Sequence, residues 1–358
     1  MEEVPCPVIG ITGSAGKTTT TTLLGRMADA AIHSPKKAWV GGNIGNPLIS
    51  SVHQMKSTDL AIMEISSFQL EQMTSSPAIA AVLNITPNHL DRHGTMETYI
   101  AAKARILDYQ KDDDIAILNR QDTGSWNLRP HVKGKLVTFG EAPSTTGEPG
   151  TRLVKDMIVY ADGATIEPLL PVSNIQIRGR HNVRNVLAAC AIAKAAGFST
   201  QAIQQGVQGF GGVAHRLEFV REYRGTRWYN DSIATAPERT MAAIHSFQEP
   251  LILLAGGRDK NLPWEDFAKL ANQRVKHLIL FGEAAGKIED EVKKQQDSSS
   301  KLKDIHPCGT LKEAVLYAAG IIKSGDVVLL SPGGTSFDAY KDFEERGEEF
   351  RKWVQQLS

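Results

Sequence analysis

The sequence predicts an α/β protein with two domains. Apolar runs typical of buried strands alternate with helix-like segments through the first 120 residues, which favours a mostly parallel sheet covered by helices. A second series of strands and helices follows a Gly-rich stretch at residues 206–213. A chain of 358 residues also exceeds what one hydrophobic core usually serves. We therefore expect domains at residues 1–212 and 213–358.

The first strand, turn and helix form a candidate nucleotide site. An apolar run at residues 8–11 is followed by T-G-S-A-G-K-T, a shortened phosphate loop in which Ile11 replaces the usual first glycine. Glycines let backbone N–H groups approach phosphates, Lys17 can reach the terminal phosphates, and Thr18 can ligate magnesium. An ordinary turn before a helix is the weaker alternative. The residues expected to hold phosphates are Gly13, Ser14, Ala15, Gly16, Lys17, Thr18 and Thr19.

Polar residues follow other predicted strands of the first domain. Residues 59–65 predict a buried strand with Glu64 near its end, and residues 80–85 predict a strand before a polar cluster that contains His89. Ligands bind at the carboxyl ends of strands in open α/β sheets, so Glu64 is a candidate for binding magnesium or orienting water. A capping or exposed acid is the alternative. From the residues alone, His89 and Lys103 could equally be surface side chains.

Three further features complete the first domain. Residues 39–47 predict a Gly- and Asn-rich loop, in which Asn43 could hydrogen-bond a ligand, although a plain turn fits as well. Residues 153–168 alternate around A-D-G, which predicts a hairpin and thus a small antiparallel addition to the sheet. The helix that follows carries Asn182 and Asn185 on one face.

The second domain has the pattern of a Rossmann-like α/β unit. Its helices alternate with strands, and its last segment, residues 338–357, predicts a charged amphipathic helix. The strands are predicted at residues 217–220, 227–229, 251–254, 277–281 and 327–330.

Charge and composition argue against several kinds of partner. The 40 Lys and Arg residues balance 40 Asp and Glu residues, which gives no sign of a nucleic-acid or anionic-membrane partner. No apolar run approaches membrane-spanning length, and the N-terminus lacks the apolar core of a signal peptide, so we expect a cytoplasmic location. The three cysteines are far apart, which suits a reducing compartment and offers no zinc site.

Taken in order, the motifs resemble those of the Mur ligase family, and within it the glutamate-adding members. The resemblance covers essentially the whole chain. Its motifs are G-S-A-G-K-T-T-T, G-G-N-I-G-N-P, E-I-S-S-F-Q-L-E, N-H-L-D-R-H, A-A-K-A-R-I, G-R-H-N-V-R-N, A-H-R-L-E, N-D-S-I-A-T, S-P-G-G-T-S-F-D and F-E-E-R-G-E-E-F.

The resemblance implies a P-loop-type ATPase domain and a set of metal ligands. Lys17 and Thr18 would hold the phosphates of ATP and a first Mg²⁺ ion, with Glu64 as another ligand of that ion. His89 matches the histidine that binds a second Mg²⁺. Lys103 matches a lysine that the family carries as a carbamate, an oxygen-donor anion of the kind a hard cation prefers.

The resemblance also implies substrate contacts. Asn43 and Ser66 would touch a nucleotide-sugar substrate, and Asn182 and Asn185 would lie near adenine. Arg216 and Asp231 would reach the phosphates and ribose from the C-terminal domain. The residues that match positions around glutamate are Thr235, Lys260, Ser336, Phe337 and Phe343.

One position departs from many relatives. This chain has Ile233 where those relatives have a lysine in the sequence D-S-K-A-T. Ile233 cannot supply the positive charge of that lysine near the amino-acid site.

The implied reaction is amide formation through an acyl phosphate. A carboxylate of UDP-N-acetylmuramoyl-L-alanine would attack the γ-phosphate of ATP, and D-glutamate would then displace phosphate, a step of peptidoglycan precursor synthesis. Closure of the two domains would exclude water from the acyl phosphate. We expect a monomer that acts on small molecules.

The start of the sequence bears on which substrates we expect this chain to bind. Family members carry an N-terminal domain that binds UDP, whereas this sequence starts a few residues before the phosphate loop. We therefore expect ATP binding with weak binding of the UDP substrate.

Two other functions are alternatives to D-glutamate addition. One is another amide ligase of the superfamily, such as a folylpolyglutamate type, and the other is an ATP-binding remnant without activity. The S-P-G-G-T-S loop and the F-E-E-R-G-E-E-F ending favour the glutamate-adding type.

Overall fold

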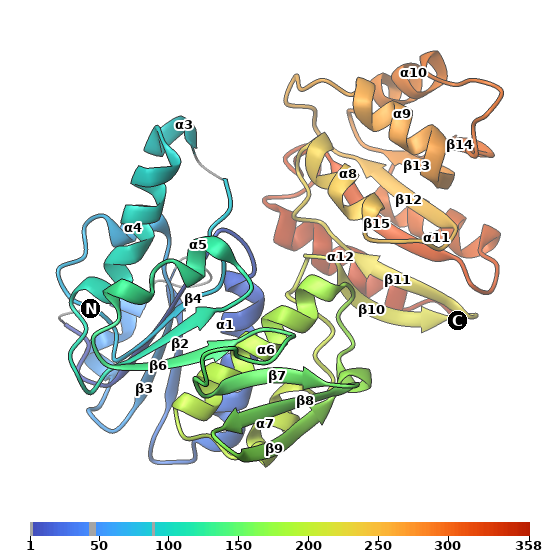
Figure 1. The fold of residues 1–358 in the computed structure, drawn as a ribbon. Helices are drawn as coiled ribbons and strands as arrows, with labels where there is room; N and C mark the ends of the chain where they lie inside the picture. The colour runs from blue at the N-terminus through green and yellow to red at the C-terminus, as the bar shows by residue number, and fades with distance from the viewer. Residues whose placement is uncertain (1–2, 43–47, 88–89) are drawn as a thin grey trace. The chain divides into compact units, whose positions relative to one another are not determined.

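The chain forms two compact units, Met1–Phe210 and Gly211–Ser358. The computed structural model describes residues 3–42, 48–87 and 90–358. Each unit contains one β-sheet with packed helices, which confirms the predicted α/β class (Figure 1). Within the described ranges, no helix is long and apolar enough to cross a membrane.

The sheet of the first unit is mostly parallel. Its described strands follow the order β2-β3-β1-β4-β5-β6-β7-β8-β9, in which only the β7–β8 and β8–β9 pairs are antiparallel. The predicted parallel sheet with a small antiparallel addition is therefore confirmed. The strands are β1 Val8–Thr12, β2 Ala38–Gly42, β3 Leu60–Glu64, β4 Ile79–Val82, β5 Ile115–Asn119, β6 Lys135–Phe139, β7 Gly150–Val154, β8 Met157–Asp162 and β9 Thr165–Pro171.

Two groups of helices pack on this sheet. Helix α1 contacts α6 and α7, whereas α2 and α4 contact each other over a separate core. In α4 the buried residues Tyr99, Lys103 and Ile106 recur at helical spacing, so the lysine lies on the face that enters the core. The helices are α1 Lys17–Ala31, α2 Ser67–Leu70, α3 Leu90–His93, α4 Met96–Asp108, α5 Thr123–Trp126, α6 Arg180–Ala195 and α7 Thr200–Val207, with 3-10 turns η1 Leu48–Gln54, η2 Arg129–His131 and η3 Val172–Asn174.

Two local predictions in this unit were wrong. The strand expected at residues 80–85 ends at Val82, because the next residues leave the sheet and hydrogen-bond the phosphate loop. Residues 39–42, expected in a loop, belong to strand β2, where Trp39 pairs with Ala61 and donates its indole N–H to Asp59 at 2.9 Å. Asn43 lies outside the described residues.

The second unit has a six-stranded sheet of order β10-β11-β15-β12-β13-β14 among the described residues. Only β10 and β11 pair antiparallel, and β15 lies between β11 and β12. The strands are β10 Glu218–Tyr223, β11 Thr226–Asn230, β12 Leu251–Gly256, β13 Val275–Phe281, β14 Asp304–Pro307 and β15 Val327–Gly333.

Helices on the second sheet divide its core in two. One cluster contains buried residues of α8 Pro237–His245, α9 Glu265–Arg274 and α10 Ala285–Lys294; the other contains residues of α11 Leu311–Ile321 and α12 Phe343–Gln355. The last helix was expected from residue 338 but begins at Phe343, because the Asp342 carboxylate caps it by accepting the Glu345 N–H at 2.8 Å. Strand β14 was missed, since it is a short, half-exposed edge strand.

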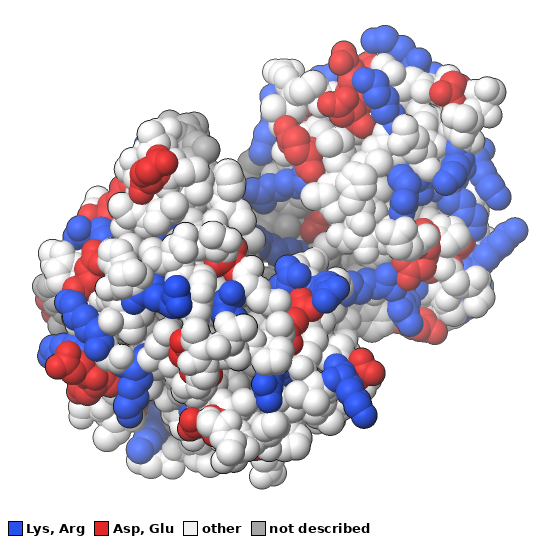
Figure 2. Space-filling model, in the orientation of Figure 1, with Lys and Arg blue, Asp and Glu red and all other residues white. Residues whose placement is uncertain are grey.

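Charged side chains of both signs are interspersed over the face drawn in Figure 2. Oppositely charged side chains also pair directly, as Arg258 and Glu283 do at 2.9 Å.

Candidate functional site

The loop between β1 and α1 has the geometry of an anion-binding turn. Gly16 caps the helix in a left-handed conformation with φ of 84°, and Lys17 Nζ folds back to donate to Gly13 O at 3.0 Å. Among the described residues no side chain caps this helix, and its first turn contains no acid. The backbone N–H groups in the first turn of α1 and the positive end of its helix dipole are therefore directed at this loop.

A residue of the neighbouring strand connection holds the loop in shape. Asn84 forms two hydrogen bonds with Ala15, accepting from its N–H at 2.8 Å and donating to its carbonyl at 2.9 Å. The Ser14 N–H donates to Asn84 O at 2.9 Å, and its hydroxyl lies 3.0 Å from that of Tyr99. Sequence analysis missed Asn84, although its place just after a predicted strand was a usable signal.

The two predicted asparagines of α6 lie beside the same loop. A Cβ atom on Gly16 would come within 2.3 Å of Asn185 Oδ1, so only glycine allows this approach. Asn185 Nδ2 donates to Asn182 Oδ1 at 3.0 Å, and Asn182 Nδ2 donates to Arg178 O at 2.6 Å. Asn182 thus orients Asn185, which faces the loop.

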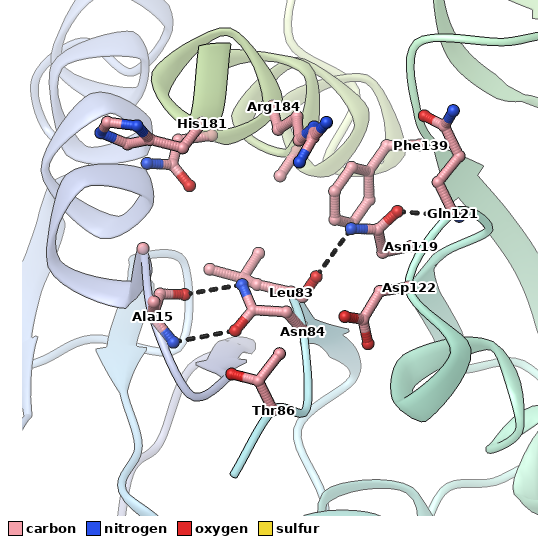
Figure 3. A pocket seen from close by; sticks show the side chains of 13 residues that line it. Ala15, Leu83, Asn84, Thr86, Asn119, Gln121, Asp122, Phe139, His181 and Arg184 are labelled. Carbon is pink, nitrogen blue, oxygen red and sulfur yellow. Dashed lines mark hydrogen bonds between the residues drawn. The ribbon is translucent and has the colours of Figure 1, made fainter. Parts of the chain in front are cut away.

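A pocket of about 450 Å³ opens next to the phosphate loop (Figure 3). This volume suits a small organic ligand. Three expected residues line it, namely Ala15, Gly16 and Asn185, while Asn182 is not among the described lining residues. The lining residues that sequence analysis missed are Leu83, Asn84, Thr86, Asn119, Gln121, Asp122, Phe139, His181, Arg184 and Ala188.

Glu64 and Lys103 are both buried near the end of β1. Glu64 ends β3 opposite Ile11, is 2% exposed, and its Oε2 has no hydrogen-bond partner among the described residues. Lys103 is 1% exposed, and its Nζ donates to Thr12 Oγ1 at 3.4 Å. Burial, with a smaller effect from the charge of Lys17, lowers the pKa of Lys103 to about 7.

The described residues contain no group of three or more His, Cys, Asp or Glu side chains that could hold a metal ion. His89 lies outside the described residues. Thr18, Glu64 and Lys103 are described, and their assignment as metal ligands stays a prediction. Ser66 caps α2, where its hydroxyl and N–H both donate to Gln69 Oε1, at 3.0 and 2.9 Å.

In the second unit, Asp231 follows β11 and is held by two donors. Its Oδ2 accepts from the Ser331 hydroxyl at 2.8 Å, and its Oδ1 accepts from the Leu217 N–H at 3.1 Å. Burial raises the pKa of this carboxyl to about 7, although both hydrogen bonds oppose the shift. Arg216, the neighbouring predicted residue, is exposed.

A fully buried arginine ties together the loops at the carboxyl ends of β11 and β15. Arg346 Nε and one terminal nitrogen donate to Ser232 Oγ at 3.0 Å and Ser232 O at 2.8 Å. The other terminal nitrogen donates to Gly334 O at 3.1 Å and Thr335 O at 3.0 Å. Burial lowers the pKa of Arg346 to about 10. Sequence analysis missed it, although a charge spaced four and eight residues before Phe350 and Val354 was a signal.

The residues expected around glutamate come from the loops after β11, β12 and β15 and from the start of α12. Lys260 Nζ donates to Thr235 Oγ1 at 3.4 Å, and Ser336 is buried beside Thr335. Phe343 begins α12, and its carbonyl accepts from the Ser232 hydroxyl at 2.8 Å. Phe337 is 60% exposed. Ile233 donates its N–H to His215 O at 3.1 Å, so its backbone is part of this loop structure.

Two known protein families match this chain, one in each unit. The family described as "Mur ligase middle domain" matches residues 11–193, and that described as "Mur ligase, glutamate ligase domain" matches residues 215–334.

Relatives of similar sequence extend this match. The chain is 42% identical to a UDP-N-acetylmuramoylalanine–D-glutamate ligase of Acetivibrio thermocellus, over 99% of this chain and 76% of that protein. It is also 42% identical to the protein of that name from Symbiobacterium thermophilum, over 98% of this chain and 76% of the relative.

Solved structures share the fold. A MurF from Acinetobacter baumannii superposes with a TM-score of 0.67 at 21% identity, covering 98% of this chain and 78% of that one. A UDP-N-acetylmuramoyl-L-alanyl-D-glutamate–2,6-diaminopimelate ligase gives a TM-score of 0.69 at 20% identity, covering 99% of this chain and 80% of that one.

Proposed function

Because the chain belongs to the Mur ligase family, we propose that it adds D-glutamate to UDP-N-acetylmuramoyl-L-alanine, converting ATP to ADP and phosphate. The observation that carries this proposal is the 42% identity to D-glutamate ligases along nearly the whole chain. The phosphate loop with an adjoining pocket of nucleotide size supports it.

In this proposal the triphosphate of ATP lies on the loop of Gly13 to Thr19. Its adenosine extends into the adjoining pocket, where Asn185 is oriented by Asn182. Lys17 already points back over the loop, and its positive charge would offset the charge of the transferred phosphate.

The described residues fit a bound magnesium ion. The buried Glu64 carboxylate has an oxygen without a protein partner among those residues, and a buried charge of this kind is normally compensated by a cation. Thr18 and Glu64 would supply hard oxygen ligands for a first ion, and His89 with the Lys103 carbamate would hold a second. Magnesium here would neutralise phosphate charge.

Carbamate formation on Lys103 is consistent with its surroundings. Carbon dioxide reacts with a neutral amine and not with an ammonium ion. Because burial lowers the pKa of Lys103 to about 7, a large fraction of this amine is neutral near pH 7. The carbamate would also place a negative charge beside the positive charge of Lys17.

The reaction proceeds in two displacements. A carboxylate oxygen of the alanyl substrate attacks the γ-phosphorus, and the bond to the leaving ADP oxygen breaks, which gives an acyl phosphate. The amine nitrogen of D-glutamate then attacks the acyl carbon, loses a proton, and expels phosphate from the tetrahedral intermediate. Thr235, Lys260, Ser336, Phe337 and Phe343 would hold the glutamate, with Arg216 and Asp231 directed to the nucleotide.

A phosphate-release assay on the full chain tests this function. We expect release that requires ATP, Mg²⁺, UDP-N-acetylmuramoyl-L-alanine and D-glutamate together, with little activity when L-glutamate replaces the D-isomer. Turnover with a folate and L-glutamate would instead indicate the folylpolyglutamate type. ATP binding without turnover under saturating substrates would contradict ligase activity.

A further inference from the structure

We propose that Arg184 forms one wall of the nucleobase end of the pocket, stacking its guanidinium on the base, and that Glu141 holds it in that position. This inference rests on the proposed function, since it takes the pocket to bind ATP. Arg184 is a direct contact in this proposal, and Glu141 is a positioning residue.

The Arg184 side chain is fixed by an ion pair with good geometry. Its Nε donates to Glu141 Oε1 at 2.7 Å, and the Glu141 side chain is only 8% exposed. The other oxygen of Glu141 accepts from Arg180 Nε at 2.7 Å. Both carboxylate oxygens are thus engaged, and the carboxylate fixes one edge of the Arg184 guanidinium.

The position of Glu141 places Arg184 at the end of the pocket away from the phosphates. Glu141 follows β6 by two residues, and the last residue of that strand, Phe139, lines the pocket. Figure 3 shows Arg184 and Phe139 on one side of the pocket and Ala15, in the phosphate loop, on the other. In this proposal the base of a triphosphate held on that loop lies at this other side, against Phe139 and Arg184.

The chemistry of this end suits a flat aromatic ring. Leu83, Phe139 and Ala188 provide apolar lining, and a planar guanidinium stacks readily on aromatic faces. Glu141 shares its single negative charge between Arg180 and Arg184, so Arg184 keeps part of its positive charge. Because the carboxylate occupies the Nε edge of Arg184, the face of the guanidinium is what this side chain offers to the pocket.

The same carboxylate provides a matched control. Arg180 makes an equivalent ion pair with Glu141 but is not among the described residues that line the pocket. Its side chain is 78% exposed, compared with 52% for Arg184. Removing Arg180 therefore removes one partner of Glu141 without changing the proposed contact to the base.

The test measures equilibrium binding of Mg-ATP and of Mg-ribose 5-triphosphate, which lacks only the base, to the full chain. Arg184→Ala should weaken ATP binding roughly 3- to 30-fold and leave ribose 5-triphosphate binding unchanged. Arg180→Ala should leave both unchanged. Glu141→Gln should weaken ATP binding less than Arg184→Ala, and the double variant should bind no more weakly than Arg184→Ala alone.

The outcomes separate this inference from the proposed function. Arg184→Ala binding ATP like the wild type, or losing affinity equally for ribose 5-triphosphate, would overturn the stacking role while leaving ATP binding intact. A wild-type chain that binds neither compound would overturn the nucleotide site and this inference together. Circular dichroism of each variant checks that the fold is retained, which matters most for Glu141→Gln because the Glu141 side chain is buried.

Discussion

Asn84 and Ala15 are joined by two hydrogen bonds across 69 residues of sequence, the Ala15 N–H to Asn84 Oδ1 at 2.8 Å and Asn84 Nδ2 to Ala15 O at 2.9 Å. This pair fixes the phosphate loop to the connection after β4. The loop is therefore organised before a nucleotide arrives, which reduces the entropy lost on binding.

Replacing Asn84 should loosen that loop. We expect Asn84→Ala to weaken ATP binding about tenfold, because two hydrogen bonds of roughly 1 kcal/mol each are lost and the loop becomes less ordered. Isothermal titration with Mg-ATP measures this, with the exposed Asn174→Ala as control. An Asn84→Ala protein with wild-type affinity would show that the loop does not depend on this pair.

Gly16 should tolerate no side chain. A Cβ there would meet Asn185 Oδ1 at 2.3 Å and would also force a left-handed residue with φ of +84°. Gly147 has φ of +88°, but a Cβ atom placed on it would have no described atom within 4 Å, so Gly147→Ala isolates the backbone strain. We expect Gly147→Ala to cost about 1 kcal/mol of stability with normal ATP binding, and Gly16→Ala to abolish detectable ATP binding. Similar ATP affinities for the two variants would argue against the clash.

Replacing Glu64 should raise the stability of the protein and lower its activity. Glu64→Gln keeps the shape of the side chain but removes a buried charge whose Oε2 lacks a described partner. In the absence of metal we expect a higher melting temperature than that of the wild type. Ligase turnover should fall by about 10²-fold or more because the proposed Mg²⁺ ligand is lost. Calorimetry without Mg²⁺ and the phosphate-release assay measure the two effects; retained turnover would exclude Glu64 as a metal ligand.

The stability of the second unit and its binding of D-glutamate should depend on Arg346. Lysine has one nitrogen and cannot reach Ser232, Gly334 and Thr335 together, so Arg346→Lys leaves buried carbonyls without donors. We expect a loss of roughly 2–4 kcal/mol of stability and a raised KM for D-glutamate, with unchanged Mg-ATP affinity. Arg351→Lys, on the same helix but paired with carboxylates at a partly exposed site, is the control and should be milder. An unchanged KM in Arg346→Lys would separate this residue from the amino-acid site.

Asp231 should make stability depend on pH. Burial raises its pKa to about 7 in the folded protein, above the ordinary aspartate value of 3.8, so the folded state retains a proton that the unfolded chain has released. The free energy of unfolding should therefore fall as pH rises from about 4 to 7, by at most about 1.4 kcal/mol per pH unit from this group.

Asp231→Asn removes this contribution, because an amide does not titrate. The difference in stability between variant and wild type should change with pH over that window and level off above it. Urea unfolding of both proteins at several pH values, monitored by tryptophan fluorescence, measures it; the buried Trp228 and Trp264 of the second unit contribute to this signal. Parallel pH profiles for the two proteins would mean that folding does not raise the pKa of Asp231.

The sequence alone determined the class of fold, the phosphate loop and the position of Glu64 at the end of a strand. These follow from patterns within about ten residues: apolar runs, a Gly-rich turn, and the change from strand to helix. The order of the motifs along the chain was also enough to indicate the family, which the comparisons confirm.

Only the tertiary structure decided which side chains meet. Asn84 reaches Ala15, Asn185 faces Gly16, and Arg346 joins two loops, each across tens of residues or more. Periodicity along a chain cannot specify such contacts, because parallel strands far apart in sequence bring their carboxyl ends to the same edge of a sheet. The tertiary structure also decides which side chains are buried. The sequence around Lys103 does not mark it as buried, and its lowered pKa arises because the folded core surrounds it.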